Sequence, residues 1–183
     1  MKKADLPRAV FLTGFMGAGK TSVGRALARR LGWRFVDLDR RIESTEGCSI
    51  RNLFQQRGES GFRRAESAAL RHLLAEMKRS PATVAALGGG TLTIARNRQR
   101  LRQHGGPLVF LEAPLGTLHR RCRRTGHKRP WFANYKHFRQ LYQTRLPLYS
   151  KATLRVSTWR KHPRTVAAKV AAALGLGSRR EAR

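Results

Sequence analysis

A single octet constrains this chain more than any other feature: Gly14-Phe15-Met16-Gly17-Ala18-Gly19-Lys20-Thr21. It has the form G-x-x-x-x-G-K-[ST], with an apolar run before it and a segment of helical periodicity after it. Glycines at these positions let backbone N–H groups turn around a phosphate, and the N-terminus of the following helix adds partial positive charge. The pattern therefore predicts a nucleoside-triphosphate site rather than a glycine-rich turn with an exposed lysine.

The polar residues of this loop have distinct chemical tasks. Lys20 is expected to reach the β- and γ-phosphates, and the Thr21 hydroxyl is expected to ligate Mg²⁺. The residues of the loop expected to bind the nucleotide are Gly17, Ala18, Gly19, Lys20, Thr21 and Ser22. The sequence thus predicts that a nucleoside triphosphate binds here with one Mg²⁺ per site.

Short β-rich apolar runs alternate with longer helical stretches along the whole chain. The predicted strands are residues 9–13, 34–38, 83–87, 108–112 and 153–157. The predicted helices are residues 20–31, 50–56, 60–78, 96–103, 116–123, 134–146 and 163–174. This alternation is typical of an α/β fold, and we predict a five-stranded parallel sheet with helices on both faces. No repeat or linker divides residues 1–183, so we expect one domain ending in a short basic tail, 177–183.

The charge balance is unusual, with 39 basic residues against 10 acidic ones and a net charge of +29. Such an excess favours anionic partners. The basic residues, 30 of them arginine, are spread from Arg8 to Arg183 instead of forming one tract. We therefore interpret them as a solvated surface, with nucleic acid as at most a non-specific partner.

Cysteine content and apolar run lengths bear on the compartment. Cys48 and Cys122 form neither a metal-binding spacing nor a disulfide framework. The apolar runs are too short to span a bilayer, and no apolar stretch of signal-peptide length follows the N-terminus. We expect a cytoplasmic protein with no membrane partner.

Two of the three aspartates, Asp37 and Asp39, lie at the end of the second predicted strand. Open α/β sheets bind ligands at the carboxyl edge of their strands, and a P-loop site needs a carboxylate for its metal. Because residues i and i+2 share one face of a strand, both carboxylates are expected to point into one site. The alternative, a helix-capping aspartate, would explain one of the two.

Four further patches suggest an acceptor site and a lid. Arg63 and Glu66 have the i, i+3 spacing of an ion pair on one helix face. Gly88-Gly89-Gly90 ends the third strand, where bare backbone can approach a small molecule. Cations crowd the segment 120–130, which is a candidate lid over the phosphoryl group. Arg145 is placed at a helix end just before Pro147.

From near its start to about residue 175, the chain resembles shikimate kinase. The resemblance rests on six features in order: the P-loop, Asp37-x-Asp39, Phe62-Arg63-Arg64-x-Glu66, Gly88-Gly89-Gly90, Arg129-Pro130, and Arg145 before Pro147-Leu148-Tyr149. It implies a P-loop kinase fold with an acceptor-binding region at about 40–70 and a small lid at about 120–134. The implied reaction transfers the γ-phosphoryl group of ATP to the 3-hydroxyl of shikimate, a step in aromatic amino-acid biosynthesis.

The resemblance also implies a role for each matching residue. The expected holders of the substrate carboxylate are Arg63 and Arg145, with Glu66 orienting Arg63; a guanidinium fits a carboxylate bidentately. Asp39 would bind the ring hydroxyls and accept the proton of the attacking one, and Asp37 would hold Mg²⁺. The other implied site residues are Gly88, Gly89 and Gly90 as the wall beside the substrate, Lys20 and Arg129 as catalytic cations on the phosphates, and Arg124 against the adenine.

Two departures from the family pattern lie in the lid. The segment is about two residues shorter than the common form, so Arg123 or Arg121 could take the place of Arg124. Trp131 follows Pro130 where the family usually has a smaller aliphatic residue.

Two other functions remain open at this point. One is a kinase of the same fold for another small hydroxy acid, aminoshikimate or gluconate. The other is a non-catalytic, kinase-like protein that binds nucleic acid. A monomer is the expected state of a small kinase that must open and close its lid.

Overall fold

Five parallel strands form the centre of the molecule in the computed structural model, which describes residues 7–79, 81–124 and 134–177. The strands are β1 (Ala9–Thr13), β2 (Arg34–Asp37), β3 (Thr83–Ala86), β4 (Leu108–Glu112) and β5 (Leu154–Ser157). They pair in the order β2-β3-β1-β4-β5, with every pairing parallel. The predicted α/β fold with a five-stranded parallel sheet is confirmed.

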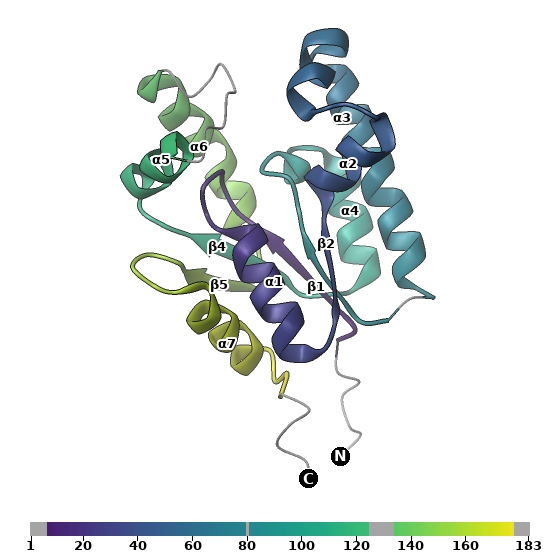
Figure 1. Cartoon of the computed structure of the whole chain (residues 1–183), viewed down its shortest axis with the longest axis vertical. Coiled ribbons are helices and arrows are strands. Elements are labelled where there is room, and N and C mark those ends of the chain that lie inside the picture. Colours follow the sequence, from purple (N-terminus) through teal and green to yellow (C-terminus); the bar gives the residue numbers. More distant parts are fainter. Residues whose placement is uncertain (1–6, 80, 125–133, 178–183) are drawn as a thin grey trace.

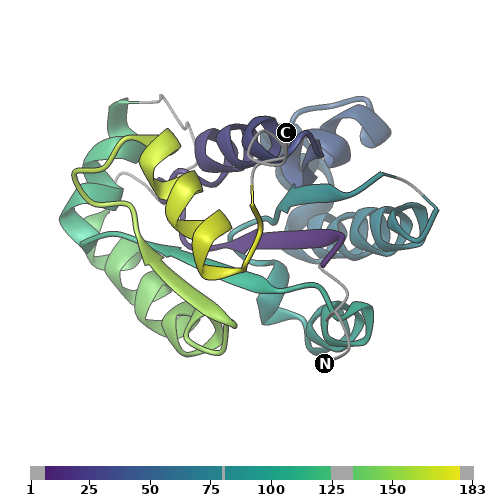
Figure 2. The ribbon, with the colours of Figure 1, turned by 90° about the horizontal axis from the view of Figure 1, so that it is seen from below.

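Helices cover both faces of this sheet. They are α1 (Lys20–Leu31), α2 (Leu38–Glu46), α3 (Ile50–Met77), α4 (Ala95–His104), α5 (Leu115–Arg124), α6 (Tyr135–Tyr149) and α7 (Pro163–Ala173), with a short 3₁₀ helix, η1 (Thr91–Thr93). α1 and α7 pack against each other on one face, whereas α4 and α6 lie on the other (Figure 2). Because both faces are covered, the central strands are buried along their length: β1 and β3 have no exposed residue.

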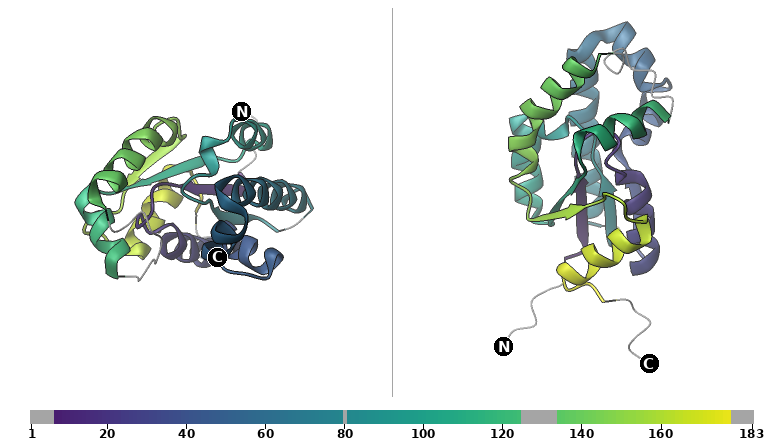
Figure 3. Two further views of the ribbon diagram at one scale, coloured as in Figure 1. Left: turned by 90° about the horizontal axis from the view of Figure 1, so that it is seen from above. Right: turned by 90° about the vertical axis from the view of Figure 1, so that its left-hand side faces the viewer.

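Parts of the helical layer extend beyond the carboxyl edge of the sheet and form two separate groups there. α5 and α6 rise above one side of this edge, and α2 with the first part of α3 rises above the other (Figure 1). Seen from above, β1 and the start of α1 lie between the two groups (Figure 3). The octet follows β1, whose neighbours are β3 on one side and β4 on the other. Ligands of open α/β sheets bind at such a switch point.

Two helices, α2 and α6, differ from the sequence prediction. α2 was not predicted; it begins directly after Asp37, whose side chain caps it. The two helices predicted at 50–56 and 60–78 are confirmed: they are the two parts of α3, which Gly58 separates with non-helical dihedral angles, a φ of 62° and a ψ of −172°. α6 runs through Pro147 to Tyr149 instead of ending at 146. Pro147 is so close to the end of the helix that it removes only one of the last backbone hydrogen bonds.

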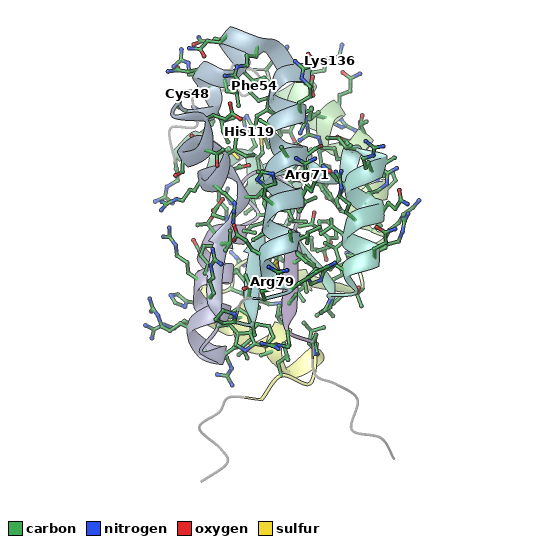
Figure 4. All side chains as sticks on the ribbon, turned by 90° about the vertical axis from the view of Figure 1, so that its right-hand side faces the viewer. Cys48, Phe54, Arg71, Arg79, His119 and Lys136 are labelled. Carbon is green, nitrogen blue, oxygen red and sulfur yellow. The ribbon has the colours of Figure 1, made fainter. Side chains whose placement is uncertain are left out.

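The basic excess is spread over several elements. α1, α4, α5, α6 and α7 contain no acidic residue, whereas α2 and α3 contain most of the acids. Several of these acids form ion pairs: Glu76 with Arg41, and Glu46 with Arg57 at 2.7 Å. Arg71 lies on α3, and Arg79 lies just beyond the end of this helix (Figure 4). The excess of basic residues is therefore largest on the helices that have no acidic residue, and the solvated-surface interpretation stays a prediction. Within the described residues, no helix is long and apolar enough to cross a membrane.

Candidate active site

The octet forms a tight loop, the P-loop (residues 14–21), against the helix that follows β4. Gly14 has a φ of 141°, and a Cβ there would lie 2.4 Å from the carbonyl oxygen of Leu111. Gly17 has a φ of 78°, and a Cβ there would lie 2.7 Å from the carbonyl oxygen of Leu118. Only glycine combines these dihedral angles with this close packing. Gly17, Ala18 and Gly19 therefore lie where the sequence places a phosphate cradle.

The Lys20 ammonium folds back over this loop. Its Nζ donates to the carbonyl oxygens of Gly14 at 2.8 Å and Phe15 at 3.2 Å. Lys20 begins α1, and Thr21 and Ser22 follow in its first turn. Backbone N–H groups of a first turn have no partner within the helix and carry partial positive charge. The loop, the ammonium and this helix end together form a site for an anion.

Thr21 and Asp37 meet beside the loop, because the start of α1 and the end of β2 lie at the same edge of the sheet. Thr21 Oγ1 donates to Asp37 Oδ2 at 2.7 Å. Asp37 Oδ1 accepts from the backbone N–H of Asp39 at 3.2 Å, so Asp37 is also the N-cap of α2. The expectation that Asp37 and Asp39 share a strand face is wrong, since β2 ends at Asp37 and Asp39 is helical. The capping interpretation holds for Asp37.

A hydroxyl and a carboxylate fit Mg²⁺, which prefers oxygen ligands and completes its shell with phosphates and water. Among the described residues, no group of three or more His, Cys, Asp or Glu side chains could hold a metal alone. The protein oxygens at Thr21 and Asp37 therefore suit a metal that arrives with a nucleotide better than one held by a protein cage.

Next to the P-loop lies a pocket of about 210 Å³. It is bounded by α3, α6, the P-loop and the segment after β3. Its lining residues are Met16, Asp39, Phe54, Glu59, Phe62, Arg63, Glu66, Gly88, Gly89, Gly90, His137, Leu141 and Arg145. All six residues that the sequence assigns to substrate binding, together with Glu66, are in this set.

Arg63 enters the pocket from α3, held by two carboxylates. Its Nη1 donates to Glu66 Oε2 at 2.7 Å, and its Nη2 donates to Glu59 Oε1 at 3.1 Å. Glu66 is fully buried and also accepts from Thr91 Oγ1 at 2.6 Å. Burial lowers the pKa of Arg63, but the charges and hydrogen bonds of Glu66 and Glu59 outweigh it and hold that pKa above its usual value. The predicted pair is therefore present and oriented.

Arg145 enters from α6 on the opposite side and is 9% exposed. Its Nη1 donates to the carbonyl oxygen of Gly89 at 3.3 Å, and Tyr149 Oη donates to the same oxygen. Within the described residues, no carboxylate forms an ion pair with Arg145. Burial lowers its pKa, and the nearby Arg63 charge lowers it further. A buried cation of this kind favours an anionic ligand.

Gly88, Gly89 and Gly90 leave room for these charged groups. A Cβ at Gly88 would lie 2.4 Å from Glu66 Oε1. A Cβ at Gly90 would lie 2.1 Å from Arg63 Nη1, and one at Gly89 would lie 3.7 Å from Arg145 Nη1. The absence of a Cβ at Gly88 and Gly90 therefore makes room for Glu66 and Arg63, whereas a Cβ at Gly89 would be in ordinary contact with Arg145.

The comparisons with known proteins agree with this geometry. The family model for shikimate kinase matches residues 16–175. The chain belongs to the shikimate kinase family. Shikimate kinase of Persephonella marina is 36% identical over 156 residues, which cover 85% of this chain and 92% of that protein. Shikimate kinase of Thermus thermophilus is 40% identical over 164 residues, which cover 86% of each chain.

Solved structures of the shikimate kinase family share the fold closely. Shikimate kinase from Acinetobacter baumannii in complex with shikimate matches with a TM-score of 0.84 and 37% identity, covering 93% of this chain and 94% of that one. A gluconokinase from Sinorhizobium meliloti matches with a TM-score of 0.60 and 22% identity, covering 94% of each chain. At that identity the likeness concerns the fold alone.

The arginines that the sequence assigns to the lid and to the adenine lie in different surroundings. Arg129 and the segment 125–133 lie outside the described residues. Arg124 is the last residue of α5 and is exposed, as is Arg123. Arg121 bonds instead to the P-loop and to Thr158. Arg121 thus lies beside the P-loop, and the assignment of one of these three arginines to the adenine stays a prediction.

Aromatic residues that the sequence analysis did not assign connect the two halves of the site. Phe15, fully buried in the P-loop, packs edge-on against Phe138 of α6 with ring centroids 5.0 Å apart. The Arg145 guanidinium lies 5.9 Å from the centre of the Phe15 ring. Phe54 and Phe62 stack at 4.5 Å on the other wall. No spacing in the sequence indicates these contacts, because their partners come from different elements or from opposite sides of the Gly58 kink.

Proposed function

We propose that this chain transfers the γ-phosphoryl group of ATP to the 3-hydroxyl of shikimate, giving shikimate 3-phosphate and ADP. One observation carries the proposal. Arg63 and Arg145 reach the same small pocket from α3 and α6, directly beside a P-loop. A pocket with two convergent guanidinium groups suits a small carboxylate, and its neighbour suits a triphosphate.

The carboxylate of the acceptor would bind between Arg63 and Arg145. Glu66 orients Arg63, and the Gly89 carbonyl orients Arg145, so both forks are positioned before the substrate binds. This preorganisation reduces the entropy lost on binding. With the carboxylate held there, the ring hydroxyls would face Asp39 on the same pocket wall.

Asp39 would accept the proton of the attacking hydroxyl. That oxygen forms a bond to the γ-phosphorus while the bond to the β-phosphate oxygen breaks, and ADP leaves. Lys20 and the P-loop N–H groups would stabilise the charge on the phosphates. Mg²⁺, held through Thr21 and Asp37, would neutralise charge on the β- and γ-phosphates when bound.

Some expectations from the sequence stay proposals. Arg129 would act as the lid cation on the phosphates, and Arg124 would lie against the adenine. The chain would act as one domain, as a monomer and in the cytoplasm. Binding of nucleic acid would be non-specific and would weaken steeply with salt.

A coupled ADP-release assay tests the proposal. The wild-type chain with Mg·ATP is compared for shikimate, gluconate and no acceptor. We expect ADP release with shikimate, and none with gluconate or without an acceptor. Asp39→Asn should abolish the release with shikimate. Turnover with gluconate but not shikimate would contradict the proposed acceptor, and ATP binding without turnover on either would contradict the proposed kinase.

Arg145→Lys gives a second, sharper test of carboxylate recognition. Lysine keeps the charge but loses the planar fork. We expect KM for shikimate to rise on the order of 10- to 100-fold, with KM for ATP little changed. An equal rise in both constants would contradict the assignment of Arg145 to the acceptor.

A further inference from the structure

We propose that the face shared by α3 and α4 binds the phosphate backbone of double-stranded nucleic acid, independently of base sequence. Five cations form this basic face: Arg64 and Arg71 of α3, Lys78 at its C-cap, and Arg96 and Arg100 of α4. None of them lines the acceptor pocket or belongs to the P-loop. The proposal therefore goes beyond the kinase reaction and does not depend on it.

A row of cations follows one side of α3. Arg64, Arg71 and Lys78 are exposed and spaced seven residues apart, which is about two helical turns. The positions between them on this side, Ala68 and Ala75, have short side chains. At a rise of 1.5 Å per residue the row is about 21 Å long. A duplex backbone of about six base pairs has the same length.

α4 supplies the other part of the basic face. Arg96, Arg100 and His104 have the i, i+4, i+8 spacing of one side of this helix. His104 lies near the end of α3, where the charge of Lys78 helps to lower its pKa. The side of α4 that contains Arg96 and Arg100 is therefore turned toward α3, and the two helices lie side by side (Figure 1 and Figure 4).

The acidic residues of these helices are engaged with other cations. α4 contains no acidic residue, and α3 contains three, which are Glu59, Glu66 and Glu76. Glu59 and Glu66 accept from Arg63, and Glu76 accepts from Arg41. Within the part of the chain that the structure describes, no ion pair includes a cation of the basic face. This face therefore presents uncompensated positive charge, which favours a polyanion.

The composition of the basic face favours a duplex over other polyanions. Four of its five cations are arginine, whose planar guanidinium binds phosphate oxygens bidentately. Helices that bind anionic membranes insert large apolar side chains, and single strands stack their bases on exposed aromatic rings. The large apolar residues exposed among the described ones are Tyr135 of α6 and Trp159 after β5, and neither belongs to α3 or α4. A phosphate backbone bound from outside is the partner that this chemistry fits.

Removing charge from the basic face should weaken binding and reduce its salt dependence. Each phosphate contact releases counterions, so the slope of log K against log salt concentration falls by about one for each lost arginine. We expect a variant combining Arg71→Gln, Arg96→Gln and Arg100→Gln to lower this slope by about three and the affinity at low salt by about tenfold or more. Arg71→Gln alone should lower the slope by about one.

The experiment measures the fluorescence anisotropy of short labelled DNA and RNA duplexes across a KCl series. The matched control combines Arg29→Gln, Arg30→Gln and Arg164→Gln, which removes three exposed charges from α1 and α7, on the face of the sheet opposite α4. Equal weakening in this control would overturn the proposal in favour of net charge alone. Failure of the wild type to bind either duplex at low salt would overturn it too. Tighter binding of one duplex would support it and identify the source of the backbone.

Two further measurements separate the basic face from other sites. Saturating Mg·ATP should leave duplex affinity unchanged, whereas displacement of the duplex would assign binding to the P-loop and overturn the proposal. Vesicles of phosphatidylserine and phosphatidylcholine that bind more tightly than either duplex, and release the triple variant, would replace nucleic acid with a membrane surface. Because these assays contain no phosphoryl transfer, failure of the chain to phosphorylate shikimate would leave their outcome unaffected.

Discussion

The guanidinium of Arg63 fills the space that a side chain at position 90 would need. A Cβ on Gly90 would lie 2.1 Å from Arg63 Nη1 and 2.6 Å from its Cζ. The two residues lie on different elements, the middle of α3 and the start of η1. The position of the Arg63 guanidinium therefore requires that residue 90, which is 27 residues later in the chain, has no Cβ.

Gly90→Ala is expected to impair acceptor binding without unfolding the chain. Gly90 has a φ of −112°, which any L-residue adopts, so the substitution causes no backbone strain. The added methyl group instead displaces the Arg63 guanidinium from its bonds with Glu66. We expect KM for shikimate to rise roughly tenfold or more, measured by steady-state kinetics. Gly116→Ala is the control, since a Cβ there has no neighbour within 4 Å; an equal effect there would contradict the explanation.

The two carboxylates that accept hydrogen bonds from Arg63, those of Glu66 and Glu59, are expected to contribute unequally to stability and to acceptor binding. Glu66 is fully buried, whereas the Glu59 side chain is 62% exposed. Removing one partner of a buried ion pair leaves the other inadequately compensated. We expect Glu66→Gln to lower the free energy of unfolding by about 3 kcal/mol and to raise KM for shikimate. Urea denaturation and kinetics of Glu59→Gln, which should change little, provide the comparison; similar losses in both variants would argue against this difference.

The Mg²⁺ concentration that the reaction requires is expected to depend on the Thr21 hydroxyl. Thr21→Ser keeps the oxygen that bonds Asp37, and Thr21→Val replaces it with a methyl group of similar size. We expect the Mg²⁺ concentration for half-maximal rate to rise on the order of tenfold or more in Thr21→Val, and to change little in Thr21→Ser. Activity is measured across a Mg²⁺ titration at fixed ATP. An unchanged requirement in Thr21→Val would remove Thr21 from the metal site.

Acid stability is expected to depend in part on His104, at the end of α4. Burial lowers the pKa of His104 below its usual value of 6.5, and the nearby Lys78 charge lowers it further. Its ring packs edge-on against Phe11, with centroids 5.2 Å apart. The unfolded chain therefore binds a proton at the His104 ring more tightly than the folded chain does. The contribution of neutral His104 to the free energy of unfolding is complete above pH 6.5 and is lost as the pH falls through the folded-state pKa.

The test compares urea denaturation of wild type, His104→Gln and His72→Gln between pH 5 and pH 8. His104→Gln cannot titrate, so its free energy of unfolding should fall less than that of the wild type on acidification. His72 is exposed, and His72→Gln should follow the wild type. Identical pH dependence in all three proteins would show that His104 makes no contribution.

Local signals in the sequence predicted much of this molecule. The octet and the strand–helix alternation indicated the fold. The site roles of Asp37, Arg63, Gly88 and Arg145 were predicted because the short motifs around them resemble those of shikimate kinase. These signals are readable because they arise within one loop, one strand or one helical turn. Helix α2 was not predicted, because its cap, Asp37, also had a functional interpretation. The two helices predicted at 50–56 and 60–78 correspond to the parts of α3 on either side of Gly58, whose backbone is not helical.

The order of residues along the chain is enough to specify that a phosphate loop follows a buried strand and that arginines suited to a carboxylate are present. What these groups contact depends on the packing of the folded chain. That packing divided Asp37 and Asp39 between the Thr21 hydroxyl and the acceptor pocket, and it placed Phe15 beside Arg145. It also committed Arg121 to Gly17 and Thr158. The physical reason is that each of these contacts joins residues from separate elements, whose distances are set by how the helices pack on the sheet and by no periodicity along the chain.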